Sequence, residues 1–259
     1  MTAINPHPTE SDAAPATLCG RGSEPQLAAL RELQRKHAFW DCRLLAGCAQ
    51  GAFSRDDLRY IFSQYHLYTS SFTRFLAAVM VNCESDLFRA RLSENLWEEG
   101  GGCDPERRHA QLFRNFLHRS LGVDDVARID YEPFTRQFVA AYLDQALRYP
   151  AMAAAAFLAI GTEGIVPRVY EIMRHGLRQA GIPDNELEFF DIHIACDDAH
   201  AVTLEHMMLS YADQPGWFEA CAGALHRALD LRTEFFDRLV DALHDVRLEP
   251  NGRRRHRPA

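Results

Sequence analysis

The chain has 259 residues, of which 47% are hydrophobic and 25% are charged, as in ordinary globular proteins. Its 28 basic and 36 acidic residues give a formal charge of −8. This balance argues against nucleic acid and against an anionic membrane as partners, because both favour a basic face. The longest uncharged apolar run, 151–161, is shorter than the roughly 18 residues of a membrane span. Without a secretory signal at its start, the chain is expected to be cytoplasmic.

Two residue types narrow the chemistry further. The seven cysteines are odd in number and include no CxxC pair, so we expect reduced thiols. Lys36 is the only lysine, and nothing around it suggests a cofactor site. Schiff-base chemistry needs a lysine amine, so a pyridoxal phosphate enzyme is not expected.

The chain divides into three parts by composition. Residues 1–24 predict a disordered leader and residues 248–259 a basic flexible tail. In 25–247, apolar residues recur at steps of three and four, the spacing of helices. The predicted helices are 56–82, 89–99, one that starts at Asp104-Pro105, 134–147, 152–178, 183–212 and 215–246. No segment alternates as a strand does, so we expect an all-α, single-domain bundle of about seven helices.

A first group of candidate metal ligands lies in the pattern H-x3-D-x2-H. On one continuous helix, His193, Asp197 and His200 fall within about 60° of one another. The neighbouring residues are mostly apolar, which indicates a buried helix. Burying such side chains without a partner costs several kcal/mol, so a metal ion is the favoured interpretation over a solvent-exposed polar face.

A second candidate is Glu163, the only acidic residue between Asp144 and Glu171. It lies in an apolar helix that Pro167 must distort, because proline lacks the N–H that would bond to the carbonyl group of Glu163. Gly161 on the other side allows close approach of a backbone or a ligand. A buried glutamate at such a site favours a cation, the alternative being an arginine partner in the core.

A third group combines a helix end, the glycine turn 100–102 and His109. Two acids compete as its carboxylate. Glu99 precedes the turn, whereas Glu106 forms with His109 an E-x2-H pair, the spacing of ferritin-like diiron sites. Acids favour the first turn of a helix, which accounts for Glu106 without a metal but does not account for Glu99.

The order of these residues resembles that of the haem-oxygenase-like diiron oxidases and oxygenases, seven-helix proteins that hold two non-haem irons. The resemblance covers about residues 26–243, and its specific part is the turn 95–102 and the six ligand types. It implies the metal ligands Glu99, His109, Glu163, His193, Asp197 and His200. In this family the first carboxylate precedes the glycine turn, so the resemblance favours Glu99 over Glu106. Haem oxygenase itself needs no carboxylates, and the thiamine-degrading relatives depend on a nucleophilic cysteine, so both are disfavoured.

The resemblance implies an oxidoreductase that uses O2 and two Fe(II) ions, without haem, flavin or pyridoxal phosphate. Three histidines and three carboxylates suit iron or manganese, and the absence of thiolates argues against structural zinc. The expected substrate is a small metabolite derived from an amino acid or an amine, in secondary-metabolite biosynthesis. An external electron donor and a homodimer are both compatible with this family.

Residues of the expected substrate pocket are Tyr65, His66, Arg74, Thr162 and Phe190. For Tyr65 and Phe190, core packing is the stronger expectation. Arg74 could bind a substrate carboxylate with two parallel hydrogen bonds, and a structural salt bridge is equally expected.

The expected reaction type depends on the lack of acidic residues in one segment of the sequence. Members of the family that oxygenate nitrogen resemble one another in offering an extra carboxylate from the helix before the first ligand, and 58–83 contains no Asp or Glu. We therefore expect oxidative bond cleavage. Hydroxylation of an amine nitrogen is one alternative, and a non-catalytic iron-binding or interaction protein on the same scaffold is another.

Overall fold

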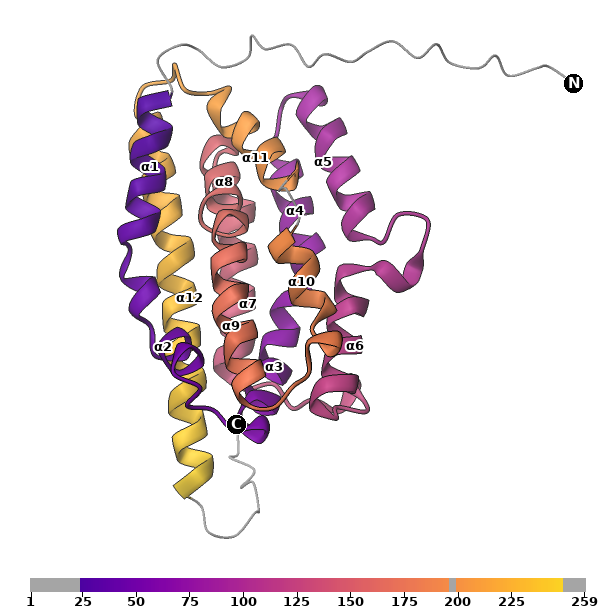
Figure 1. Ribbon diagram of the computed structural model, residues 1–259. Coiled ribbons are helices and arrows are strands. Elements are labelled where there is room, and N and C mark those ends of the chain that lie inside the picture. The colour runs from indigo at the N-terminus through magenta and orange to yellow at the C-terminus, as the bar shows by residue number, and fades with distance from the viewer. Residues whose placement is uncertain (1–23, 196–198, 249–259) are drawn as a thin grey trace, which may run out of the picture.

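The computed structural model describes residues 24–195 and 199–248, with the side chains of 199–200 and 244–248 left out. Within these residues all regular structure is helical (Figure 1), which confirms the predicted all-α class. The α-helices are α1 (Glu24–Lys36), α2 (Arg43–Ala49), α3 (Arg55–Thr69), α4 (Phe72–Val81), α5 (Asp86–Glu99), α6 (His109–Leu121), α7 (Pro133–Arg148), α8 (Ala151–Ala159), α9 (Val166–Gln179), α10 (Glu188–Ala195), α11 (Ala199–Leu209) and α12 (Trp217–Leu248). Short 3-10 turns lie at η1 (Ala38–Asp41), η2 (Pro105–Arg107), η3 (Val126–Arg128), η4 (Glu163–Ile165) and η5 (Asp184–Glu186).

The described residues thus hold twelve α-helices where about seven were predicted. The predicted helices 56–82 and 152–178 are interrupted, 183–212 is described as α10 and α11, and α1 and α2 were not among the predicted helices. The predicted helix 56–82 is two helices, α3 and α4, separated at Ser70 and Ser71. The hydroxyl group of Ser70 donates to the carbonyl oxygen of Leu67 at 3.2 Å. Serine side chains that form hydrogen bonds to the nearby backbone in this way compete with continuation of the helix. The spacing of apolar residues in the sequence does not reveal this competition.

The long helix α12 forms one side of the bundle and packs against α1, α2, α7 and α8 (Figure 1). The alanine-rich α8 lies in the interior, with all but Met152 of its residues buried. A Cβ atom on Gly161, just beyond α8, would lie 2.6 Å from the Cβ atom of Ala228 on α12. Only glycine allows this close approach, which seats the end of α8 directly on α12.

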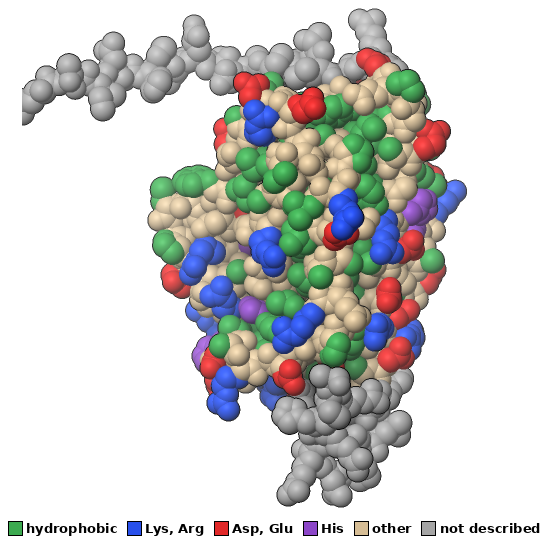
Figure 2. Space-filling model, turned by 180° about the vertical axis from the view of Figure 1, so that it is seen from behind, with side chains coloured by type: hydrophobic (Ala, Val, Ile, Leu, Met, Phe, Trp, Pro, Cys, Tyr) green, Lys and Arg blue, Asp and Glu red, His purple; other side chains and the backbone are tan. Residues whose placement is uncertain are grey.

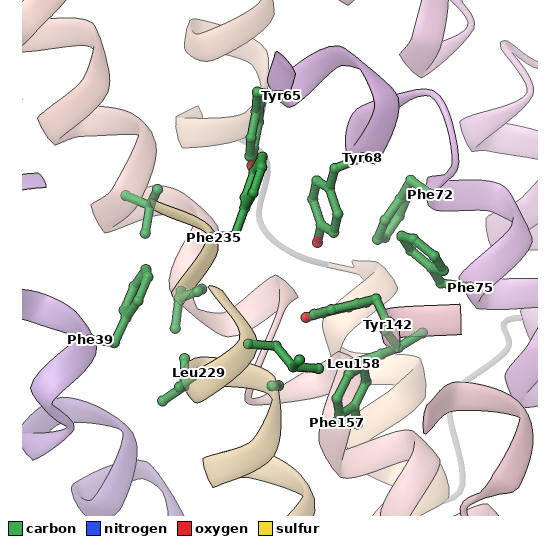
Figure 3. Packing of buried hydrophobic residues seen from close by; sticks show 14 of the residues in the cluster. Phe39, Tyr65, Tyr68, Phe72, Phe75, Tyr142, Phe157, Leu158, Leu229 and Phe235 are labelled. Carbon is green, nitrogen blue, oxygen red and sulfur yellow. The ribbon is translucent and has the colours of Figure 1, made fainter. Parts of the chain in front are cut away.

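Aromatic side chains fill the centre of the bundle (Figure 3). Tyr68 and Phe75 from α3 and α4 meet Tyr142 of α7, with ring centroids 5.2 to 5.6 Å apart. On the surface seen in Figure 2, acidic and basic side chains are interspersed with apolar ones rather than gathered by sign.

The stretch Ala151–Gln179 is long and apolar enough to cross a membrane when judged by length and composition alone. However, 72% of its most apolar window is buried inside the protein. Core helices of globular proteins pass the same test, so this stretch is weak evidence for a span.

Candidate metal centre

Glu99 and His109 meet because a glycine turn reverses the chain between them. Glu99 is the last residue of α5, and the turn continues through Gly101 and Gly102, whose φ angles are 90° and 59°. A Cβ atom on Gly101 would lie 2.4 Å from the carbonyl oxygen of Asp104, so this position requires glycine on two grounds. The chain then enters α6 at His109, whose Nδ1 atom lies 3.1 Å from Oε2 of Glu99.

This geometry corrects the predicted helix start and separates the two competing acids. Asp104 caps the 3-10 turn η2 through the backbone N–H of Glu106, and α6 begins only at His109. Glu106 and His109 therefore do not share a helix face, and Glu106 is exposed. The side chain of Glu99, in contrast, is only 8% exposed and faces His109.

His193 reaches the same point from α10. Its Nε2 atom lies 3.1 Å from Nδ1 of His109, and its Nδ1 atom lies 2.5 Å from the carbonyl oxygen of Phe189. Because a carbonyl oxygen can only accept, Nδ1 of His193 carries the proton and donates it to Phe189. The Nε2 lone pair is left pointing at His109, which is how metal-binding histidines are oriented in proteins.

Glu163 enters the group through a break in the predicted helix 152–178. Thr162 has non-helical angles, φ −125° and ψ −71°, and Glu163 begins the 3-10 turn η4, with Pro167 in the first turn of α9. The distortion expected at Pro167 is present and is a full interruption. The carbonyl group of Ile160, freed by this break, accepts from Nε2 of Gln34 at 2.7 Å. This hydrogen bond offsets the cost of an unpaired buried carbonyl.

A cavity of about 360 Å³ joins these side chains. Glu99, His109, Glu163 and His193 all line it. The remaining lining residues are Trp97, Glu98, Gly101, Gly102, Arg107, Leu112, Val166 and Ile192. Four of the six predicted ligands, drawn from four separate helical segments, therefore lie around one cavity of the size that small ligands occupy.

The other two predicted ligands cannot be placed. Asp197 lies outside the described residues, and so does the side chain of His200, although its backbone lies in the first turn of α11. Of the predicted single helix through H-x3-D-x2-H, the described residues hold α10, which ends at Ala195, and α11, which begins at Ala199, and residues 196–198 lie outside the description. Considering only the side chains that are described, no three of Asp, Glu, His and Cys are arranged so that they could hold a metal ion by themselves.

Two pairs of the described donor atoms nevertheless have the spacing of neighbouring ligands on one cation. Two ligands that each lie about 2.1 Å from one metal at right angles are about 3 Å apart, close to the spacing of Glu99 Oε2 and His193 Nε2 from Nδ1 of His109. Both of those atoms have lone pairs that can point to Nδ1 of His109, which carries a proton in that arrangement. A metal ion would replace this proton, so binding would be linked to proton release.

The five predicted substrate residues lie outside the lining of this cavity. Tyr65 and Phe190 are core residues, packed respectively against Phe113 and Phe116. Thr162 is buried beside Glu163, and its hydroxyl group bonds to Tyr142 and to the carbonyl oxygen of Phe157. Arg74 is exposed on α4.

His66 is a buried histidine outside the lining of the cavity. Its Nδ1 atom lies 2.6 Å from the hydroxyl group of Tyr131. Burial, and secondarily the charge of Arg114, lower the pKa of His66 to about 4, so its imidazole is neutral near pH 7.

One polar group in the core was not expected from the sequence. Arg232 of α12 is 1% exposed, and its guanidinium donates to the hydroxyl groups of Tyr68 and Tyr142 at 2.6 and 3.2 Å. Those two hydroxyl groups face the same interior space (Figure 3). Through Tyr142, Arg232 is connected to Thr162, the residue before Glu163. The sequence signal that could have revealed it is the spacing: buried Ala228 and Leu229 precede Arg232 by four and three positions, and buried Phe235 and Phe236 follow it by three and four.

Comparison with known proteins identifies the family. The sequence profile described as iron-containing redox enzyme matches residues 59–233. Among solved structures, a CADD-like protein of unknown function from Nostoc punctiforme is similar, with a TM-score of 0.69 and 18% identity over 90% of this chain and 100% of that chain. A domain of unknown function with a haem-oxygenase-like fold from Shewanella denitrificans has a TM-score of 0.66 and 13% identity, over 90% and 97%. A TenA homologue from Pseudomonas syringae has a TM-score of 0.65 and 13% identity, over 84% and 90%.

A search of curated proteins gave no significant match. The solved structures are all below 25% identity, so they support the fold and leave the reaction open. The family profile spans well over half of the chain, from α3 into α12. On this match and the shared architecture, the chain belongs to the family of iron-containing redox enzymes with a haem-oxygenase-like fold.

Proposed function

We propose that this protein is a non-haem diiron oxidase or oxygenase that uses O2 to cleave a bond in a small metabolite derived from an amino acid or an amine. One observation carries the proposal: Oε2 of Glu99 and Nε2 of His193 each lie 3.1 Å from Nδ1 of His109. These atoms lie at the buried end of a cavity that Glu163 also lines. The family supports iron, and the donor atoms support its direct binding by side chains.

The donor set explains why iron suits this site better than zinc or haem. Carboxylate and imidazole groups together suit Fe(II) or Mn(II), whereas structural zinc prefers thiolates. A haem iron is held by one or two axial residues, which would leave buried Glu99 and Glu163 without a role. We assign Glu99, His109, Glu163 and His193 as ligands, together with Asp197 and His200, which lie outside the described side chains.

When bound, two ferrous ions supply the electrons with which O2 is activated. The protein orients the ligand side chains and keeps water away from the metal site. The Phe189 carbonyl oxygen fixes the ring of His193, and burial of Glu99 and Glu163 keeps their carboxylates in a low-dielectric space where a cation is held strongly. Leu112, on the wall of the cavity, limits the access of water to the same space.

Bond cleavage is favoured over nitrogen oxygenation by the residues of α3 and α4. From Leu58 to Val81 these helices carry no acidic residue. Neither helix contributes a carboxylate to the lining of the cavity, whereas the nitrogen-oxygenating members of the diiron group that the sequence resembles offer one from the helix before the first ligand.

The test is an anaerobic titration with Fe(II), followed by exposure to O2. We expect about two iron ions per chain, and less than half of this iron in His193→Ala and His200→Ala. The matched control is His118→Ala, because His118 is exposed on α6. O2 consumption should then depend on added amino acids or amines, screened as a panel for O2-dependent loss.

Two results would contradict the proposal. One tightly held zinc without iron uptake would exclude the diiron assignment. Iron uptake with no O2 consumption in the presence of any compound of the panel would favour the alternative of a non-catalytic iron-binding protein.

A further inference from the structure

The cavity has an exposed mouth and a buried floor. Trp97 at the mouth is 58% exposed, and Glu98 and Arg107 are exposed beside it. Glu99 and Glu163 on the floor are 9% and 8% exposed. A small molecule must therefore pass the mouth before its far end reaches the proposed metal centre.

Arg107 is held at this mouth on a short, well-anchored turn. The carboxylate of Asp104 caps η2, and the backbone N–H of Arg107 donates to the carbonyl oxygen of Asp104 at 3.0 Å. Within the described residues, no hydrogen bond or ion pair engages the guanidinium of Arg107. Its neighbour Arg108 differs, because Nε of Arg108 donates to the carbonyl oxygen of Pro105 at 2.6 Å.

The wall between mouth and floor is apolar. It consists of the indole ring of Trp97 and the side chains of Leu112, Val166 and Ile192. The ring of Trp97 packs over Gly102, where an added Cβ atom would lie 3.3 Å from it. Ligand sites commonly combine such a wall with a few polar groups that fix orientation, and Arg107 is the one Arg or Lys among the lining residues that the structure describes.

From this arrangement we infer that the substrate is a monocarboxylate with an apolar body, and that Arg107 binds its carboxylate at the mouth of the cavity. The planar guanidinium offers two parallel N–H groups to a carboxylate. Glu98 beside it disfavours a second negative charge on the substrate. The body then lies along Trp97, and the end distal to the carboxylate faces His109 and His193. This inference rests on the proposed function, because only an enzyme has a substrate. The binding of a carboxylate by Arg107 does not itself require iron.

The experiment measures binding of three probes of equal chain length, octanoate, 1-octanol and octylamine. The fluorescence of Trp97 reports binding, and Trp97→Phe shows which part of the signal comes from this ring. The protein is titrated as purified and again after anaerobic loading with Fe(II). We expect octanoate to bind about tenfold more tightly than 1-octanol, because one charge-assisted, two-point contact is added.

Variants of two adjacent arginines separate the inference from a general charge effect. Arg107→Gln should weaken octanoate about tenfold and leave 1-octanol unchanged, Arg107→Lys should fall between, and Arg108→Gln should match the wild type. Equal effects of Arg107→Gln and Arg108→Gln, tightest binding of octylamine, or no binding of any probe would overturn the inference.

The iron content of Arg107→Gln keeps the two proposals apart. This variant should bind Fe(II) as the wild type does, because Arg107 is not among the proposed ligands. Failure of iron binding in the wild type would contradict the proposed function alone. Normal iron binding, together with octanoate affinity that is the same in Arg107→Gln as in the wild type, would contradict this inference alone.

Discussion

The ring nitrogens Nδ1 of His109 and Nε2 of His193 lie 3.1 Å apart, and the two rings stand at 86° to each other. The two residues are separated by 84 positions in the sequence. Their rings are placed by different constraints, a glycine turn for His109 and a backbone carbonyl for His193. The contact therefore depends on the tertiary fold rather than on any one helix.

The two acids around the glycine turn should differ sharply in their effect on iron. We expect Glu99→Gln to weaken Fe(II) binding at least tenfold, since it removes a buried anionic donor next to His109. Glu106→Gln should leave binding unchanged, because Glu106 is exposed on η2. Competition with a coloured Fe(II) chelator measures both constants, and a reversed order would support the E-x2-H pair instead.

Gly101→Ala should destabilise the turn that brings Glu99 to His109. The residue has φ of 90°, which is strained for alanine, and the new Cβ atom would clash with the carbonyl oxygen of Asp104. We expect a loss of about 1–3 kcal/mol in the free energy of unfolding, together with weaker iron binding. Gly216→Ala is the control, with φ of 77° and nothing within 4 Å of the added atom. Equal losses in urea unfolding would show that the clash does not matter.

His66 should make the protein less stable as the pH falls from about 6.5 to about 4. Burial lowers the pKa of this imidazole to about 4 in the folded state, whereas 6.5 is its ordinary value. Between these values the unfolded chain binds a proton that the folded chain does not, so stability present above pH 6.5 is lost on acidification. The loss is at most about 3 kcal/mol.

The same effect can be isolated by substitution. His66→Gln should flatten the dependence of the free energy of unfolding on pH over this interval, as measured by urea unfolding at several pH values. His118→Gln, at an exposed histidine, should keep the wild-type slope. A slope in His66→Gln that equals the wild-type slope would assign the acid sensitivity to other groups.

The hydroxyl group of Tyr142 should matter for both stability and iron. It accepts from Arg232 and bonds to Thr162, the residue before Glu163. Tyr142→Phe should cost about 1–3 kcal/mol in unfolding free energy, because a buried guanidinium loses a partner. It should also weaken Fe(II) binding through displacement of Glu163. Tyr211→Phe, at a half-buried position, should change stability by less than about 0.5 kcal/mol, and unaltered iron binding in Tyr142→Phe would show that Thr162 does not position Glu163.

The helical class could be predicted because it depends on local patterns, whereas the grouping of Glu99, His109, Glu163 and His193 was expected from their residue types and from the resemblance of their order to a known family. Apolar spacing indicates helices, and ligand-type residues in otherwise apolar segments indicate a shared interior. The helix interruptions could not be predicted in the same way. At Ser70 the cause is a side-chain hydrogen bond, and at His109 the start of α6 is delayed by a 3-10 turn that has its own cap.

The substrate residues were predicted less well, for two different reasons. Arg74 follows Phe72 by two positions, which places it about 200° away on a helix, so the pattern of buried Phe72 and Phe75 already indicates an exposed arginine. The mouth of the cavity was not predicted because Arg107 lies in the short connection before α6. In such a connection the spacing of apolar residues does not indicate where a side chain points.

The four described side chains of the candidate metal centre come from α5, α6, η4 and α10, so their arrangement is lost when the chain unfolds. A ligand that binds only the folded chain stabilises it by mass action, by about 2.7 kcal/mol at a free concentration one hundred times the dissociation constant. Iron held at this point would thus act as a folding ligand. In a cell that is short of iron, the protein would spend more time open to proteases, and its abundance would follow the metal supply.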